Sequence, residues 1–274
     1  MTTLHLTSGP ECELTCDVLE GDDPPVVVLT GATGTRQISA HMMQGLVGRR
    51  RLVLLDPRGH GESTCRHPEH YTWRHLMDDV YLWLDELGIT SCSLVGTSLG
   101  AVLAMGIVVE RPELVRALAV TSPAVVAVDV PEEPEQHAAI ERLTAAFGAD
   151  GPPDAEHTAA EFSALSGMPV EQARQRLALH RDLESVATYF RSARRADIPF
   201  TRADLGRITT PTIVLPGADA VHTPEVGRQI AELIPTAELP DMSAHVGITD
   251  PTEFRMAAFA EVARWLQGAA GATS

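Results

Sequence analysis

Hydrophobic and polar positions in the first 121 residues alternate between short apolar runs and longer runs with helical spacing. A strand that is buried on both faces needs no polar alternate positions, so the apolar runs predict strands. Helical spacing is clearest over residues 73–88, which end at Gly88, and over the small-residue run 99–110. The expected strands are residues 11–20, 26–30, 52–56, 92–97 and 115–121. This order predicts a parallel sheet with helices on both faces.

The alternation is interrupted between residues 125 and 208, where Pro and acidic clusters precede helical stretches such as 170–195. An unstructured loop of this length is improbable, so we expect a folded helical cap over residues 125–208. The expected core domain combines residues 1–124 and 209–274. Its later elements are strands at 212–216 and 236–240 and helices at 224–234 and 252–267.

Gly96, Ser98 and Gly100 form a G-x-S-x-G pattern between an apolar strand and a small-residue helix. This context is typical of a nucleophile elbow, in which a strained turn exposes the serine above the sheet. The first N–H of the helix, that of Leu99, would then face a developing oxyanion. The alternative is an ordinary strand–turn–helix junction with a surface serine.

A nucleophilic serine needs a base, and we predict His245, which follows the last expected strand in the run DMSAHVG. The chain order serine, acid, histidine is the one expected for such an elbow. Asp219 is the only carboxylate between strand 212–216 and the next helix. We expect Asp219 to orient His245 and stabilise its imidazolium. The alternatives are a surface-loop histidine and an aspartate that only forms a turn.

Five segments together resemble the α/β-hydrolase superfamily, specifically its cap-bearing esterase, lactonase and peroxidase-like members. They are VVVLTGATGT, LVLLDPRGHGES, LVGTSLGAVLA, RITTPTIVLPGAD and MSAH. The resemblance implies a mostly parallel eight-stranded sheet with helices on both faces and a helical cap insertion. It also implies that the N–H of Ala32 joins that of Leu99 in an oxyanion hole. Two departures are Thr30, where the family usually has histidine, and Ala220, which stands at the family's usual acid position, one residue after Asp219.

Composition excludes several other function classes. The 274 residues include 37 acidic and 21 basic residues, giving a net charge of −16, and every basic residue is arginine. Without lysine there is no Schiff-base nucleophile, no pyridoxal phosphate attachment and no phosphate loop. The negative charge argues against nucleic-acid and polybasic membrane contacts.

We therefore expect a cytoplasmic protein without a signal peptide, acting on a small-molecule acyl substrate with no cofactor and no metal. Oligomeric state stays open. Three arginines of the cap cluster at Arg191, Arg194 and Arg195, and pairing with acids such as Glu184 is the favoured interpretation.

A dinucleotide-binding turn is the rival interpretation of the first strand–turn segment. Gly31 and Gly34 follow a strand, and Asp56 ends the next one, near the distance for a ribose-binding carboxylate. However, the third glycine would fall at Gln37. The short-chain dehydrogenases that this turn resembles usually pair a catalytic tyrosine with lysine, which the chain lacks. The glycines are therefore better interpreted as an oxyanion loop.

The four cysteines include no CxxC pair. Cys12 and Cys16 would lie roughly 13 Å apart on a strand, too far for a disulfide, so we expect reduced thiols. Cys92 falls in a buried strand and should be inert. A metal site is the alternative interpretation of the crowded segment His60, Cys65, His67, His70 and His75. It lacks the spacing of a helical zinc site, so solvated loop histidines are favoured.

The sequence thus predicts a serine hydrolase that cleaves a carboxylic ester, lactone or thioester. Ser98 would attack, His245 would act as base, Asp219 would orient it, and the N–H groups of Ala32 and Leu99 would bind the oxyanion. Two alternatives keep the fold. One is a non-hydrolytic relative performing acyl transfer, elimination or cyclisation in specialised metabolism, and the other is a non-catalytic small-molecule receptor.

Overall fold

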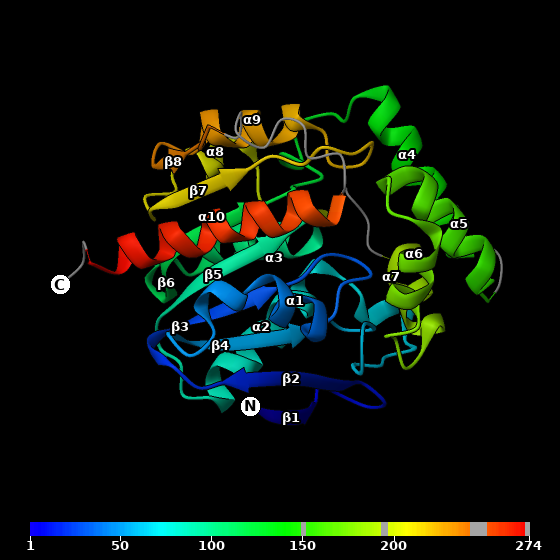
Figure 1. Cartoon of the computed structure of the whole chain (residues 1–274), viewed down its shortest axis with the longest axis horizontal. Helices are drawn as coiled ribbons and strands as arrows, with labels where there is room; N and C mark the ends of the chain where they lie inside the picture. The colour runs from blue at the N-terminus through cyan, green and yellow to red at the C-terminus, as the bar shows by residue number, and fades with distance from the viewer. Residues whose placement is uncertain (149–151, 193–196, 242–250, 272–274) are drawn as a thin grey trace.

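A computed structural model describes residues 1–148, 152–192, 197–241 and 251–271. Its centre is an eight-stranded sheet in the order β1-β2-β4-β3-β5-β6-β7-β8 (Figure 1). β2 runs antiparallel to both of its neighbours, and the strands from β4 to β8 are parallel. The strands are β1 (Thr2–Thr7), β2 (Glu13–Leu19), β3 (Asp22–Leu29), β4 (Arg50–Asp56), β5 (Cys92–Thr97), β6 (Val115–Thr121), β7 (Thr212–Leu215) and β8 (Ala237–Glu238). The predicted mostly parallel eight-stranded sheet is confirmed.

Helices cover both faces of this sheet and form a separate group at one end of it. The helices outside that group are α1 (Arg36–Met42), α2 (Trp73–Glu86), α3 (Leu99–Glu110), α8 (Arg202–Leu205), α9 (Pro224–Leu233) and α10 (Pro251–Gly271). The helices between β6 and α8 are α4 (Pro134–Ala146), α5 (Ala155–Ser166), α6 (Val170–Leu177) and α7 (Leu183–Ser192). Short 3-10 turns are η1 (Gln44–Leu46), η2 (Pro68–His70) and η3 (Pro112–Leu114).

The apolar runs of the central strands follow from burial on both faces. In β3, Val26 and Val28 pack into a core with the helix α10 residue Phe259. Their neighbours Val27 and Leu29 point to the opposite face and pack into the larger core with α2 and α3. Because successive strand side chains alternate between faces, a strand covered on both sides must be apolar at every position.

Helices α4 to α7 lie together beyond the ends of the parallel strands (Figure 1). They have an apolar core of their own, in which the rings of Phe147 and Phe190 stack with centroids 4.1 Å apart. The domain boundaries at residues 125 and 208 stay a prediction. Within the described ranges, no helix is both long and apolar enough to cross a membrane.

Candidate active site

The turn between β5 and α3 holds Ser98 in a strained conformation, with φ 53° and ψ −112°. Two glycines make this turn possible. A Cβ on Gly100 would lie 1.9 Å from the carbonyl oxygen of Leu29, and one on Gly96 would lie 2.3 Å from the carbonyl oxygen of Gly100. Strand and helix can therefore pass each other only because both positions lack side chains. The geometry is that of a nucleophile elbow, with Ser98 at the end of a central strand.

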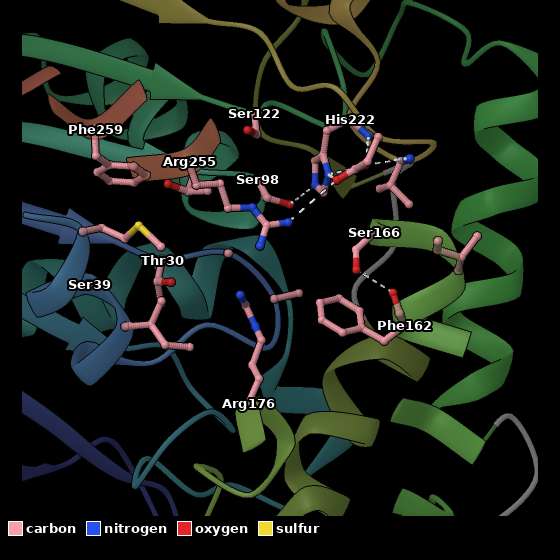
Figure 2. Close-up of a pocket in the computed structure, with 18 of the residues that line it drawn as sticks. Thr30, Ser39, Ser98, Ser122, Phe162, Ser166, Arg176, His222, Arg255 and Phe259 are labelled. Atoms are coloured by element: carbon pink, nitrogen blue, oxygen red, sulfur yellow. Dashed lines mark hydrogen bonds and ion pairs between the residues drawn. The ribbon is translucent and has the colours of Figure 1, made fainter. Parts of the chain in front are cut away.

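Ser98 contacts a histidine that is itself held by a carboxylate (Figure 2). Its Oγ lies 2.8 Å from Nε2 of His222, whose Nδ1 lies 2.8 Å from Oδ1 of Asp219. Asp219 Oδ1 also accepts from the backbone N–H groups of Val221 and His222, at 3.0 and 2.8 Å. Burial favours the neutral form of Asp219, but His222 and the charge of Arg255 outweigh it and hold the pKa of Asp219 below its usual value.

The partner of Asp219 in this arrangement is His222, which the sequence analysis did not select. His245, the predicted base, lies outside the described residues. Chain order does not separate the two histidines, because both follow Ser98 and Asp219. The sequence signal for His222 is that it lies three residues after Asp219 in the same loop, so that a turn of the chain brings the ring beside the carboxylate.

The segment expected to supply an oxyanion N–H runs beside the nucleophile. A Cβ added to Gly31 would lie 3.0 Å from Cβ of Ser98, and the turn is closed by Gly34 N–H donating to Gly31 O at 2.8 Å. Ala32 and Leu99 both line the cavity at Ser98. Leu99 is the first residue of α3, and the N–H groups of a helix's first turn have no acceptor within the helix. The oxyanion roles of these two residues stay predictions.

The alpha/beta hydrolase fold family matches residues 24–239 of the chain. The chain belongs to this family. RutD of Pseudomonas savastanoi pv. phaseolicola, named as a candidate carbamate hydrolase, is 26% identical over 85% of this chain and 92% of its own. The sn-1-specific diacylglycerol lipase ABHD11 of Xenopus tropicalis is 35% identical over 38% of this chain and 33% of its own. A hydrolase structure from Pseudomonas aeruginosa PA01 superposes with a TM-score of 0.68 at 25% identity, over 87% of this chain and 88% of the other. The protein is an α/β-fold hydrolase.

In this hydrolase Asp56 is a structural residue rather than a nucleotide ligand. Its side chain is fully buried and forms an ion pair with Arg36. It also accepts from the backbone N–H groups of Arg36 and Glu62, at 2.7 and 3.0 Å. Gly61 packs so closely that a Cβ there would lie 2.3 Å from the Asp56 carboxyl. Asp56 fixes the turn after β4, so its carboxylate has no edge free for a ribose.

Cys12 and Cys65 form a disulfide in the hydrolase, so the expectation of reduced thiols is wrong for this pair. The loop after β4 returns to the start of β2, which a comparison of Cys12 with Cys16 along one strand could not reveal. His70 Nδ1 lies 3.5 Å from Cys12 Sγ, and the side chains of Cys12, Cys65 and His70 are close enough together to surround a metal ion. However, metals bind thiolates, which bonded sulfurs do not supply, and Arg58 donates to both sulfurs. Burial raises the pKa of Cys92 to about 12, in line with its expected inertness.

His60 is wholly buried, so the expectation of a solvated loop histidine is wrong at this position. Its Nδ1–H donates to the carbonyl of Arg58 at 2.9 Å, and its ring lies edge-on to that of His180. His180 precedes α7 and accepts from Gly61 N–H at 2.9 Å. Burial lowers the pKa of His60 to about 4, and burial together with His60 lowers that of His180 to about 3. These neutral rings join the cap helices to the turn after β4.

Proposed function

We propose that the protein hydrolyses a carboxylic ester, lactone or thioester through an acyl-enzyme on Ser98. The observation that carries the proposal is the continuous hydrogen-bonded chain from Ser98 Oγ through the ring of His222 to Asp219. A neutral serine is a weak nucleophile, and this arrangement supplies both a base for its proton and a carboxylate for the resulting imidazolium. The partial likeness to a diacylglycerol lipase supports an ester substrate.

In the first half-reaction, His222 Nε2 accepts the Ser98 proton while Oγ attacks the substrate carbonyl carbon. The N–H groups of Ala32 and Leu99 stabilise the oxyanion of the tetrahedral intermediate. His222 then gives the proton to the leaving oxygen or sulfur, and the acyl group stays on Ser98. Asp219 holds Nδ1–H throughout and stays ionised.

In the second half-reaction, His222 removes a proton from water, whose oxygen attacks the acyl carbon. Collapse of the second tetrahedral intermediate returns the proton to Ser98 Oγ and releases the carboxylic acid. We place His222 in this role because its ring contacts both partners. His245, favoured by the position of MSAH after the last strand, is the alternative base.

A fluorophosphonate probe with mass spectrometry tests the nucleophile. We expect one adduct on Ser98 and none on the Ser98→Ala protein. The non-hydrolytic alternative without a covalent intermediate predicts a folded protein that takes no label, whereas the receptor alternative predicts tight binding of an intact ester over hours. A folded wild-type protein without label, or a label that persists after Ser98→Ala, would therefore contradict the proposal.

Two matched variants test the base. His222→Asn should slow labelling and p-nitrophenyl ester turnover by about 10³-fold or more, because Ser98 loses its proton acceptor. His245→Asn should leave both rates within a few-fold of wild type. The reverse result would move the base role to His245 while leaving Ser98 hydrolysis in place. Thermal melting of each variant separates loss of chemistry from loss of fold.

A further inference from the structure

The cavity at Ser98 has two chemically different lobes. One, of about 180 Å³, is mostly apolar and is lined by side chains including Trp73, Ile140, Phe190 and Ile198. The other, of about 80 Å³, is also lined mainly by apolar side chains, but it contains the guanidinium groups of Arg176 and Arg255 and hydroxyl side chains such as those of Thr30, Ser39 and Ser166. We call it the polar lobe because both arginines end there. Ser98 and His222 line both lobes, so a substrate at Ser98 can extend into each of them.

Arg176 reaches the polar lobe from α6, on the cap side (Figure 2). Its Nε donates to the backbone oxygen and Oγ1 of Thr33, at 2.9 and 3.0 Å. Its guanidinium carbon lies 5.5 Å from the ring centre of Phe162. These contacts fix the plane of the guanidinium and leave its two terminal nitrogens for the cavity. A fixed guanidinium fork suits two-point binding of a carboxylate.

The charge of Arg176 has no acidic partner among the described residues, and the only charged group that acts on it strongly is another cation, Arg255. Burial and Arg255 lower the pKa of Arg176 to about 9, so it stays positively charged at neutral pH. Arg176 is half-buried, and a charge withdrawn from water without a counter-ion is costly. A bound anion would supply the missing counter-ion.

Arg255 enters the same lobe from α10, on the opposite side to Arg176 (Figure 2). Its Nη2 lies 3.9 Å from Oδ2 of Asp219, so its charge is shared with the acid of the site. The two arginines therefore differ, because Asp219 offsets part of one charge and no described carboxylate offsets the other. Their combined field favours a single negative charge, and the nearby Asp219 carboxylate disfavours a dianion.

We propose that Arg176, assisted by Arg255, binds a carboxylate group of the substrate, whose remaining part occupies the apolar lobe. The inference rests on the proposed hydrolysis at Ser98 and names its substrate class: an ester, lactone or thioester that carries a second, anionic carboxylate. Arginine also suits phosphate, but a phosphate monoester brings close to two charges at neutral pH, which the site disfavours.

Binding to the Ser98→Ala protein tests this without requiring turnover. Calorimetry with hexanoate, its neutral amide hexanamide and hexyl phosphate compares one chain length with three head groups. We expect hexanoate to bind about 10- to 100-fold more tightly than hexanamide, the difference given by a charge-assisted two-point contact. Equal binding of hexanoate and hexanamide would overturn the anion site, and tighter binding of hexyl phosphate would overturn the carboxylate assignment.

In the Ser98→Ala protein, a second change Arg176→Gln should reduce the ratio of hexanoate affinity to hexanamide affinity by about 10- to 100-fold. Arg176→Lys, which keeps the charge but not the planar two-point donor, should reduce this ratio by less. The matched control is Arg174→Gln on the same helix, where the guanidinium is exposed and pairs with Glu156 and Glu171. That control should keep the wild-type ratio. An unchanged ratio in both Arg176 variants would refute the inference.

Turnover then separates this inference from the proposed function. A matched pair of p-nitrophenyl esters, one ending in a carboxylate and the other in its methyl ester, is used with protein that retains Ser98. We expect a higher kcat/KM for the acid and loss of that preference in Arg176→Gln. If neither ester is cleaved, the proposed function fails, while the binding ratios still decide the anion site.

Discussion

Acidification should destabilise this hydrolase through the two buried histidines that join the cap to the core. His180 Nδ1 accepts from Gly61 N–H at 2.9 Å, so its proton is on Nε2, which lies 3.3 Å from the carbonyl oxygen of Thr33. A second proton on Nδ1 would point at the Gly61 N–H. His60 is enclosed and uses its Nδ1–H on the carbonyl of Arg58. Both rings must therefore stay neutral in the folded protein.

The size of the effect follows from the pKa difference between the folded and unfolded chains. The pKa values are about 4 for His60 and about 3 for His180 when folded, against 6.5 for an unperturbed histidine. The unfolded chain binds protons below its pKa while the folded protein does not, so stability is present above pH ~6.5 and falls as pH decreases. From about pH 7.5 to about pH 5.5 each histidine removes about 1.4 kcal/mol, and together about 3 kcal/mol.

Urea unfolding, followed by the fluorescence of the buried Trp73 and Trp83, measures this loss at the two pH values. His180→Asn keeps an acceptor near Gly61 but does not titrate, so its loss should be about half that of wild type. Replacing the exposed His157 by Asn is the matched control and should leave the wild-type loss unchanged. The reasoning is refuted if His180→Asn loses as much stability as wild type between the two pH values.

Three substitutions test the catalytic acid, the disulfide and the serine turn. Asp219→Asn should lower ester kcat by about 10³- to 10⁴-fold with an unchanged melting temperature, and near-wild-type turnover would contradict its orienting role. Cys65→Ser should reduce the free energy of unfolding in urea by roughly 4 kcal/mol, because the disulfide closes a 53-residue separation, and a reductant should remove the difference from wild type. Gly100→Ala should cost roughly 3 kcal/mol in the same assay and abolish turnover, because its Cβ meets backbone oxygen at 1.9 Å. Gly268→Ala, with nothing within 4 Å, is the control and should be neutral or slightly stabilising.

The elements that sequence patterns predict are those whose residue types are dictated by burial on both faces or by close backbone contact. The strands β3 to β7 are covered on both faces, and Gly96 and Gly100 are required by backbone contacts, so both features are visible in the residues themselves. β1 was missed because it is an edge strand with mostly exposed or half-buried side chains. Helix α1 was missed because it has only seven residues, two of them buried and both polar.

Side chains that act across the cavity were harder to predict, because their partners come from distant parts of the chain. The sequence predicts that Arg191 pairs with acids such as Glu184, and the structure contains that ion pair. Arg176, which faces Ser98 across the polar lobe, has no such local pattern. Its position depends on how α6 packs over the 30–34 turn, which is a tertiary property. His222 also lacks a sequence pattern that marks it as the partner of Ser98, because only the folded loop brings its ring to that serine.

The 30–34 turn connects the proposed substrate site at Arg176 with the proposed oxyanion donor Ala32. Arg176 donates to the Thr33 carbonyl, and the neighbouring residue is Ala32, whose N–H we propose as an oxyanion donor. His180 also approaches the Thr33 carbonyl, at 3.3 Å, so the cap is attached to this turn at two points. A carboxylate bound by Arg176 would restrain the guanidinium, and through it the turn beside Ser98. His180 has a pKa of about 3 in the folded protein, so this attachment stays neutral and intact while stability falls. The preference for anionic esters should therefore persist in the folded protein between about pH 7.5 and about pH 5.5, where the free energy of unfolding already decreases.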